Sequence, residues 1–126
     1  MPRPLQILAL CASARQGSWN QRLLDHAIAE AEKLEAAVTT VDLRSLELPL
    51  YDGDLELFTP PAGAARFRQS LRDHDCLLIT TPEYNGSIPP LLKNTIDWSS
   101  RPVDGKNNLE PWTGKDTRRQ LKLSLR

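Results

Sequence analysis

Three short runs of apolar or β-branched residues, each followed by a polar stretch, dominate the pattern of this chain. They cover Leu5–Cys11, Ala37–Leu43 and Cys76–Thr80. Short runs closed by turn residues are typical of strands in a parallel sheet, and a continuous apolar run indicates burial on both faces. The pattern therefore predicts three strands.

Helical periodicity separates these strands. After the first run, apolar residues recur on one helical face, at Leu23, Leu24, Ala27, Ile28, Ala31 and Leu34. A second helix is expected from about Ala62 to Asp73, with Ala64, Phe67, Ser70 and Leu71 on one face and Arg66, Arg68, Gln69 and Arg72 elsewhere. A third is expected from Ile88 to about Trp98. The segment Leu48–Glu56 is expected to be a loop, because proline and Asp-Gly interrupt regular structure.

This alternation predicts an α/β fold, in which right-handed crossovers join parallel strands and helices cover both faces of the sheet. The end of the chain departs from it. Ser99–Gly114 is polar, and the leucines at positions 121, 123 and 125 alternate with polar residues, which predicts a short edge strand. We expect a domain at residues 1–115 and an atypical basic tail at residues 116–126.

A polar loop, Thr81–Ser87, begins where the third predicted strand ends. In open α/β sheets, ligands bind at the carboxyl ends of the strands. Pro82 and Gly86 set the backbone path of this loop, and its polar side chains and backbone N–H groups can hold a flat polar ligand. We therefore expect a binding loop here.

A second polar loop, Ser13–Asn20, leads from the first strand into a helix. A helix N-terminus offers an anion unpaired N–H groups and a partial positive charge. Ser13 and Ser18 add hydroxyl groups, and Arg15 adds a fixed charge. Serine and asparagine before a helix are also ordinary caps, so this loop alone supports either interpretation. Two such loops at the ends of buried strands favour a nucleotide site.

Composition narrows the classes of function. The 126 residues suffice for one domain with a sizeable core, and 16 basic residues balance 16 acidic ones, which argues against nucleic-acid binding. Cys11 and Cys76 fall in predicted strands, so we expect small core residues rather than redox or metal sites. No apolar run is long enough for a signal peptide or a membrane span. We expect a cytoplasmic protein without a membrane partner.

Three segments resemble the NAD(P)H-dependent FMN reductase family, flavodoxin-like flavoproteins that include quinone, azo and chromate reductases. Ser13–Asn20 resembles the phosphate loop of that family, Ser-x-Arg-x-x-Ser-x-Asn. Leu48–Glu56 resembles the loop after its second strand. Thr81–Pro89, followed by Leu92–Trp98, resembles its flavin-ring signature almost residue for residue. The similarity covers about residues 5–115.

The resemblance implies a flavodoxin-like sheet and an FMN site. The FMN phosphate would be held by Ser13, Arg15, Ser18 and Asn20, with Trp19 beside them. The isoalloxazine ring would be lined, largely through backbone groups, by Pro82, Glu83, Tyr84, Asn85, Gly86 and Ser87. The glycine that the family has before the first serine is Ala12 here, whose methyl group crowds the loop. We expect no catalytic base and no metal, because the cofactor carries the hydride chemistry.

The implied function is hydride transfer from NADPH or NADH, through FMN, to a flavin, quinone or similar small-molecule acceptor in a homodimer or homotetramer. Two alternatives remain, an FMN-binding electron carrier and an inactive fragment of a reductase. Family members continue past a segment like Trp112–Lys115 into a further strand and a glycine-rich loop, whereas no glycine follows Gly114 here. We therefore expect a chain that is truncated or altered after about Lys115.

Overall fold

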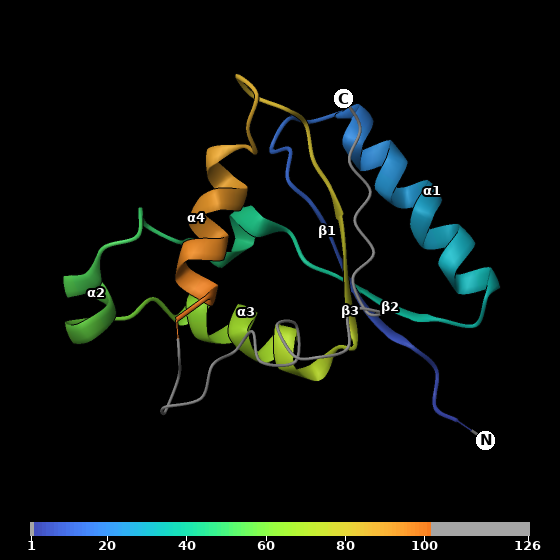
Figure 1. The fold of residues 1–126 in the computed structure, drawn as a ribbon, viewed down its shortest axis with the longest axis horizontal. Helices are drawn as coiled ribbons and strands as arrows, with labels where there is room; N and C mark the ends of the chain where they lie inside the picture. Colours follow the sequence, from blue (N-terminus) through green and yellow to red (C-terminus); the bar gives the residue numbers. More distant parts are fainter. Residues whose placement is uncertain (1, 102–126) are drawn as a thin grey trace.

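A computed structural model describes residues 2–101 of the chain (Figure 1). In this part, three parallel strands form a sheet in the order β2-β1-β3. The strands are β1 (Gln6–Cys11), β2 (Ala37–Thr40) and β3 (Cys76–Thr80). β1 is central, and its Leu8 lies opposite Thr39 on one side and Leu77 on the other. The three predicted strands and the α/β class are confirmed.

Helices cover both faces of the sheet (Figure 1). The helical elements are α1 (Trp19–Lys33), the 3-10 helix η1 (Leu43–Leu46), α2 (Gly53–Phe58), α3 (Ala62–Asp73) and α4 (Pro90–Ser99). Helix α1 packs on one face, and η1, α3 and α4 lie on the other. Helix α2 projects away from the sheet at the left of Figure 1 and buries none of its residues.

Alternation along β1 divides the core into two layers, because successive strand residues point to opposite faces. The layer toward α3 and α4 contains Leu8, Leu10, Leu43, Leu46, Phe67, Leu71 and Leu92. The layer toward α1 contains Ile7, Ala9, Cys11, Leu24, Cys76 and Leu78. Both cysteines are free thiols buried in this second layer, as small core residues.

Strand β2 is shorter than predicted, ending at Thr40 rather than Leu43. The reason is Asp42, whose Oδ1 accepts a hydrogen bond from the Arg44 N–H at 3.0 Å and so caps η1. The Ser45 hydroxyl donates to the Asp42 carbonyl at 2.6 Å and tightens the same turn. The capping residue therefore ends the strand despite the apolar residues that follow it.

The predicted loop Leu48–Glu56 contains the start of a helix, which corrects that prediction. Asp52 accepts a hydrogen bond from the Asp54 N–H at 2.8 Å and caps α2. An Asp-Gly pair can close a turn or start a helix, and here Gly53 is the first helical residue. The prediction of a loop from the Asp-Gly pair was therefore wrong, because this pair starts a helix.

Two side chains lie on the opposite side from that predicted. Leu34 is 82% exposed, because α1 ends at Lys33 and Leu34 is its C-cap. Arg68 is 6% exposed, although the sequence pattern predicts that it lies away from the buried face of α3. The predicted edge strand at positions 121–125 and the tail at 116–126 lie outside the described residues.

Candidate functional site

The two predicted binding loops lie next to each other at the carboxyl ends of β1 and β3. The Ala12 N–H donates to the Thr80 carbonyl at 2.8 Å, and the buried Thr80 hydroxyl donates to the Asn20 carbonyl at 2.9 Å. The chain goes from β1 to β2 on one side and later to β3 on the other, so this edge is the switch point of the sheet. Ligands of open α/β sheets bind at such a point. The structure therefore places Ser13–Asn20 and Thr81–Ser87 at the same edge of the sheet and joins the first loop to the last residue of β3.

Ser18, in the first loop, is the N-cap of α1. Its side chain is buried, and its Oγ accepts a hydrogen bond from the Asn20 N–H at 3.1 Å. Gly17, with φ of 67°, lets the backbone turn into this cap. The cap is uncharged and the first turn of α1 has no acidic residue. The partial positive charge of the helix N-terminus is therefore not compensated there, which favours an anion.

The outer side of the same loop carries Ser13, Arg15 and Trp19. The Arg15 N–H donates to the Ser13 Oγ at 3.4 Å, a long hydrogen bond, and the Arg15 side chain is exposed. Trp19 is 76% exposed, and the Arg22 guanidinium lies 4.6 Å from its ring centre. Trp19 therefore stacks with a neighbouring cation at the surface instead of joining the core.

Asn20 leaves a buried acceptor without a partner. Its backbone N–H and carbonyl are both hydrogen-bonded, but its Oδ1 is buried and accepts no hydrogen bond within the described chain. An unsatisfied buried polar atom costs about 1–3 kcal/mol. This oxygen is therefore suited to accept a hydrogen bond from a ligand hydroxyl or from water.

The second loop ends in a tight turn. Tyr84 and Ser87 exchange two backbone hydrogen bonds, of 2.8 and 3.0 Å. Asn85 and Gly86, with φ of 51° and 76°, are both left-handed, the type I′ arrangement for which Asn-Gly is a preferred pair. The two bonds of the turn leave out the N–H groups of Asn85 and Gly86, which can reach a ligand.

Pro82 and Glu83 connect β3 to this turn. Pro82 is half-buried, and its carbonyl accepts a hydrogen bond from the Thr81 hydroxyl at 2.9 Å. Glu83 and the ring of Tyr84 are exposed. The base of the loop is therefore anchored on the sheet, while its tip is open to the surroundings.

The signature residues on α4 hold a neighbouring loop instead of facing the turn. The Pro49 carbonyl accepts hydrogen bonds from the Asn94 Nδ2 at 2.9 Å and the Trp98 Nε1 at 2.7 Å. The Asn94 Oδ1 accepts one from the Tyr51 N–H at 2.8 Å. Trp98 is fully buried, and the ring of Tyr51 meets it edge-on at 5.0 Å. This part of the signature fastens residues 49–51 to α4.

A charge network supports the same loop. The Arg68 Nε and Nη2 donate to the Trp98 carbonyl, at 2.9 and 2.5 Å, and Nη2 lies 3.4 Å from the Glu56 Oε1. Arg101 lies 3.1 Å from the other oxygen of Glu56, to which the Tyr51 hydroxyl donates at 2.8 Å. Arg68 is thus buried because its guanidinium has two acceptors, the Trp98 carbonyl in the last turn of α4 and the Glu56 carboxylate.

This network shifts the pKa values of Glu56 and Tyr51. Burial raises the pKa of Glu56, but the hydrogen bond from Tyr51 and the guanidinium groups of Arg101 and Arg68 outweigh burial and hold that pKa below its usual value. The hydrogen bond to the Glu56 carboxylate is the main reason that the pKa of Tyr51 is raised. Glu56 is therefore an ionised acceptor in the network at neutral pH.

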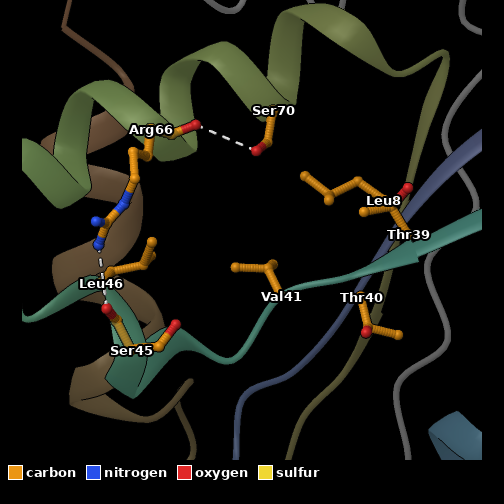
Figure 2. Close-up of a pocket in the computed structure, with 8 residues that line it drawn as sticks. All are labelled: Leu8, Thr39, Thr40, Val41, Ser45, Leu46, Arg66 and Ser70. Atoms are coloured by element: carbon orange, nitrogen blue, oxygen red, sulfur yellow. Dashed lines mark hydrogen bonds between the residues drawn. The ribbon is translucent and has the colours of Figure 1, made fainter.

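Two cavities flank β2. One of about 400 Å³ lies between the edge of β2, η1 and α3, and Figure 2 shows the Arg66 guanidinium reaching the Ser45 carbonyl, at 3.2 Å, along its wall. The other, of about 310 Å³, is lined by residues that include Cys11, Asp42 and Arg44. Neither of these two cavities is lined by a residue of the two predicted loops.

Arg44 was not predicted as a site residue. Its Nη1 donates to the carbonyl of Ala14, in the first loop, at 3.0 Å. The two residues lie 30 positions apart, and no motif in the sequence links them. Only the fold, which places η1 beside the loop after β1, brings them together.

The sheet order and the two joined loops define an α/β protein of flavodoxin-like fold. In this class of fold, nucleotides bind at the carboxyl ends of the strands. Comparison with protein families agrees with this class. Residues 5–116 match the model of the NADPH-dependent FMN reductases. The chain belongs to this family.

Individual relatives carry related names. The chain is 36% identical to the NAD(P)H-dependent FMN reductase PA1204 of Pseudomonas aeruginosa over 116 residues, which are 91% of this chain and 58% of that protein. It is 42% identical to a 2-hydroxy-1,4-benzoquinone reductase of Burkholderia sp over 98 residues, covering 78% of this chain and 51% of that protein.

A solved structure extends the comparison to three dimensions. The flavoenzyme NAD(P)H:(acceptor) oxidoreductase FerB of Paracoccus denitrificans superimposes with a TM-score of 0.77 at 29% identity, over 95% of this chain and 60% of that one. The chain thus spans between half and three fifths of the length of these relatives. Among residues 2–101, no helix is long and apolar enough to cross a membrane.

Proposed function

We propose that this chain forms the FMN-binding part of an NAD(P)H-dependent oxidoreductase that reduces flavins, quinones or similar small acceptors. The observation that carries the proposal is the junction of the two loops at the switch point, where the Ala12 N–H and the Thr80 hydroxyl tie them together. The family match and the names of the relatives support the same activity. Residues 1–115 would make up this FMN-binding unit, and residues 116–126 would lie outside it.

The start of α1 fits the phosphate of FMN. No acidic residue in the first turn compensates the partial positive charge of the helix N-terminus, and Arg15 adds a positive charge. Ser13 and Ser18 contribute hydroxyl groups. The unpaired Asn20 Oδ1 fits a hydroxyl of the ribityl chain, which can donate the hydrogen bond that this oxygen lacks in the described residues. Trp19, exposed at the same end, would flank the phosphate.

The turn at Tyr84–Ser87 fits the isoalloxazine ring. Its central N–H groups can donate to the pyrimidine edge of the ring, where negative charge gathers on reduction. Pro82 and Glu83 would lie beside the ring through their backbone. We assign no catalytic base, since FMN supplies the hydride chemistry when it is bound, and the loops bind and orient it.

We further propose a cytoplasmic homo-oligomer. Leu50, Leu57 and Phe58, on α2 and the loop before it, are each more than 70% exposed, and exposed apolar side chains of this size favour a protein contact. NAD(P)H is an intracellular reductant, and both described cysteines are free thiols. Light scattering behind size exclusion would test the oligomer, and a monomer at all concentrations would contradict it.

Reduction of bound FMN tests the activity. The chain should co-elute with FMN on size exclusion, and anaerobic addition of NADH or NADPH should bleach the flavin absorbance. Adding a benzoquinone should then restore the oxidised spectrum. Bound FMN that neither nucleotide bleaches would leave a binding module and contradict the reductase proposal.

A further inference from the structure

Arg44 contacts the first loop from a neighbouring element. Its Nη1 donates to the Ala14 carbonyl at 3.0 Å. Its Nε lies 3.5 Å from the Asp42 Oδ1, the same oxygen that accepts the Arg44 backbone N–H at 3.0 Å. The guanidinium is thus held at its base by Asp42, and it reaches the loop from a fixed 3-10 helix.

This contact determines how one peptide group of the loop is oriented. In a trans peptide, the carbonyl and the following N–H point in opposite directions. Because the Ala14 carbonyl points to Arg44, the Arg15 N–H must point to the other side, where it meets the Ser13 Oγ at 3.4 Å. At that length the bond is weak, so this N–H can donate to an anion beside Ser13.

We propose that Arg44 is a positioning residue for the phosphate loop, which keeps the Ala14–Arg15 peptide with its N–H toward the anion and its carbonyl away from it. A flipped peptide would present a carbonyl oxygen to the phosphate, which repels it. The inference rests on the proposed FMN site and adds to it a residue outside the loop. The guanidinium acts through the peptide and does not itself touch the ligand.

The charge of Arg44 must be separated from its contact with Ala14. Arg66 offers a matched control, since its Nη2 donates to the Ser45 carbonyl of the same η1 helix at 3.2 Å, and its removal changes the net charge equally. Arg44→Lys keeps both a charge and one donor for the Ala14 carbonyl. Riboflavin, which lacks the phosphate, reports the rest of the site.

The experiment is a fluorescence titration of the full chain and three variants with FMN and with riboflavin. Arg44→Met should weaken FMN binding roughly tenfold, the effect of about one hydrogen bond to a charged group, and leave riboflavin binding unchanged. Arg66→Met and Arg44→Lys should stay within about threefold of the original chain for both ligands. Unchanged riboflavin binding also shows that each variant is folded.

Amide NMR with inorganic phosphate gives a second measurement. Phosphate should shift the Arg15 amide in the original chain and shift it much less in Arg44→Met. Equal FMN affinity in Arg44→Met and the original chain, or an equal loss in Arg66→Met, would overturn the positioning role while leaving the FMN site intact. A chain that does not prefer FMN to riboflavin would overturn both proposals.

Discussion

Single contacts at the residue scale decide how closely the elements approach one another. Gly63 lies on α3 where a Cβ atom would stand 1.8 Å from the Leu46 carbonyl oxygen of η1. That distance is far inside van der Waals contact, and the neighbouring atom belongs to the backbone. Only glycine therefore lets α3 and η1 pack as they do.

Replacing this glycine tests the packing. Gly63→Ala should lower the free energy of unfolding by roughly 1–3 kcal/mol, because α3 or η1 must move to admit the methyl group. Urea denaturation measures it. Gly53→Ala is the control, since a Cβ there meets nothing within 4 Å and alanine favours α2. Equal stability of the two variants would contradict the close approach.

Arg15 provides a second prediction at this scale. Arg15→Ala should weaken FMN binding by about 1.5–3 kcal/mol, because a charge-assisted hydrogen bond to the phosphate is lost. Lys33→Ala removes the same charge from the opposite end of α1, where Lys33 pairs with Glu30, and should have little effect. If calorimetry gives one dissociation constant for both variants and the original chain, Arg15 does not belong to the site.

At the scale of elements, the apolar pattern correctly predicted the bounds that depend on burial alone. Cys76–Thr80 has the predicted bounds, because a continuous apolar run between two helix layers has one stable position. The cap at Asp42 ended β2 early and the cap at Asp52 began α2 inside the predicted loop, and such caps depend on backbone geometry that the pattern does not contain. The burial of Arg68 could not be predicted from the apolar pattern, because the Trp98 carbonyl to which it donates lies 30 positions away.

The candidate site was predictable to a similar extent. Each loop combines special backbone residues with polar side chains, and the structure has both at the carboxyl ends of strands, as predicted. Their role in binding FMN stays a prediction. The type I′ turn at Asn85 and Gly86 follows directly from that pair. The contact of Arg44 with Ala14 was not predictable, because it depends on how η1 sits beside the loop after β1.

The Glu56 network makes a prediction about pH that belongs to α2, α3 and α4 together. The pKa of Glu56 is lower in the folded chain than in the unfolded chain, so the stability that it contributes is present above the unfolded pKa and is lost as pH falls through the folded pKa. Glu56→Gln should therefore be less stable than the original chain near neutral pH, and this difference should shrink below about pH 4.

Chemical denaturation at the two pH values measures this difference. Glu30→Gln is the control, because its ion pair with Lys33 is exposed and contributes little at either pH. A difference between Glu56→Gln and the original chain that is constant with pH, or that grows on acidification, would contradict the lowered pKa.

For the whole molecule, the proposed function depends on the order of the strands. Placing β1 between β2 and β3 brings the loops that follow β1 and β3 to one edge, where the Ala12 N–H donates to the Thr80 carbonyl and the Thr80 hydroxyl donates to the Asn20 carbonyl. Helices cover both faces of the sheet (Figure 1), so its apolar residues are buried in two layers and the two polar loops follow the carboxyl ends of the strands. In the proposed site, the start of α1 would form the phosphate end and the Tyr84–Ser87 turn the ring end.

A fluorescence titration of FMN with the full chain tests this account most directly. We predict that the chain quenches FMN fluorescence saturably, with one FMN bound per chain at the end point. Riboflavin should bind more weakly, because it lacks the phosphate that the start of α1 would hold. FMN fluorescence that stays unchanged at high protein concentration, or riboflavin bound as tightly as FMN, would contradict it.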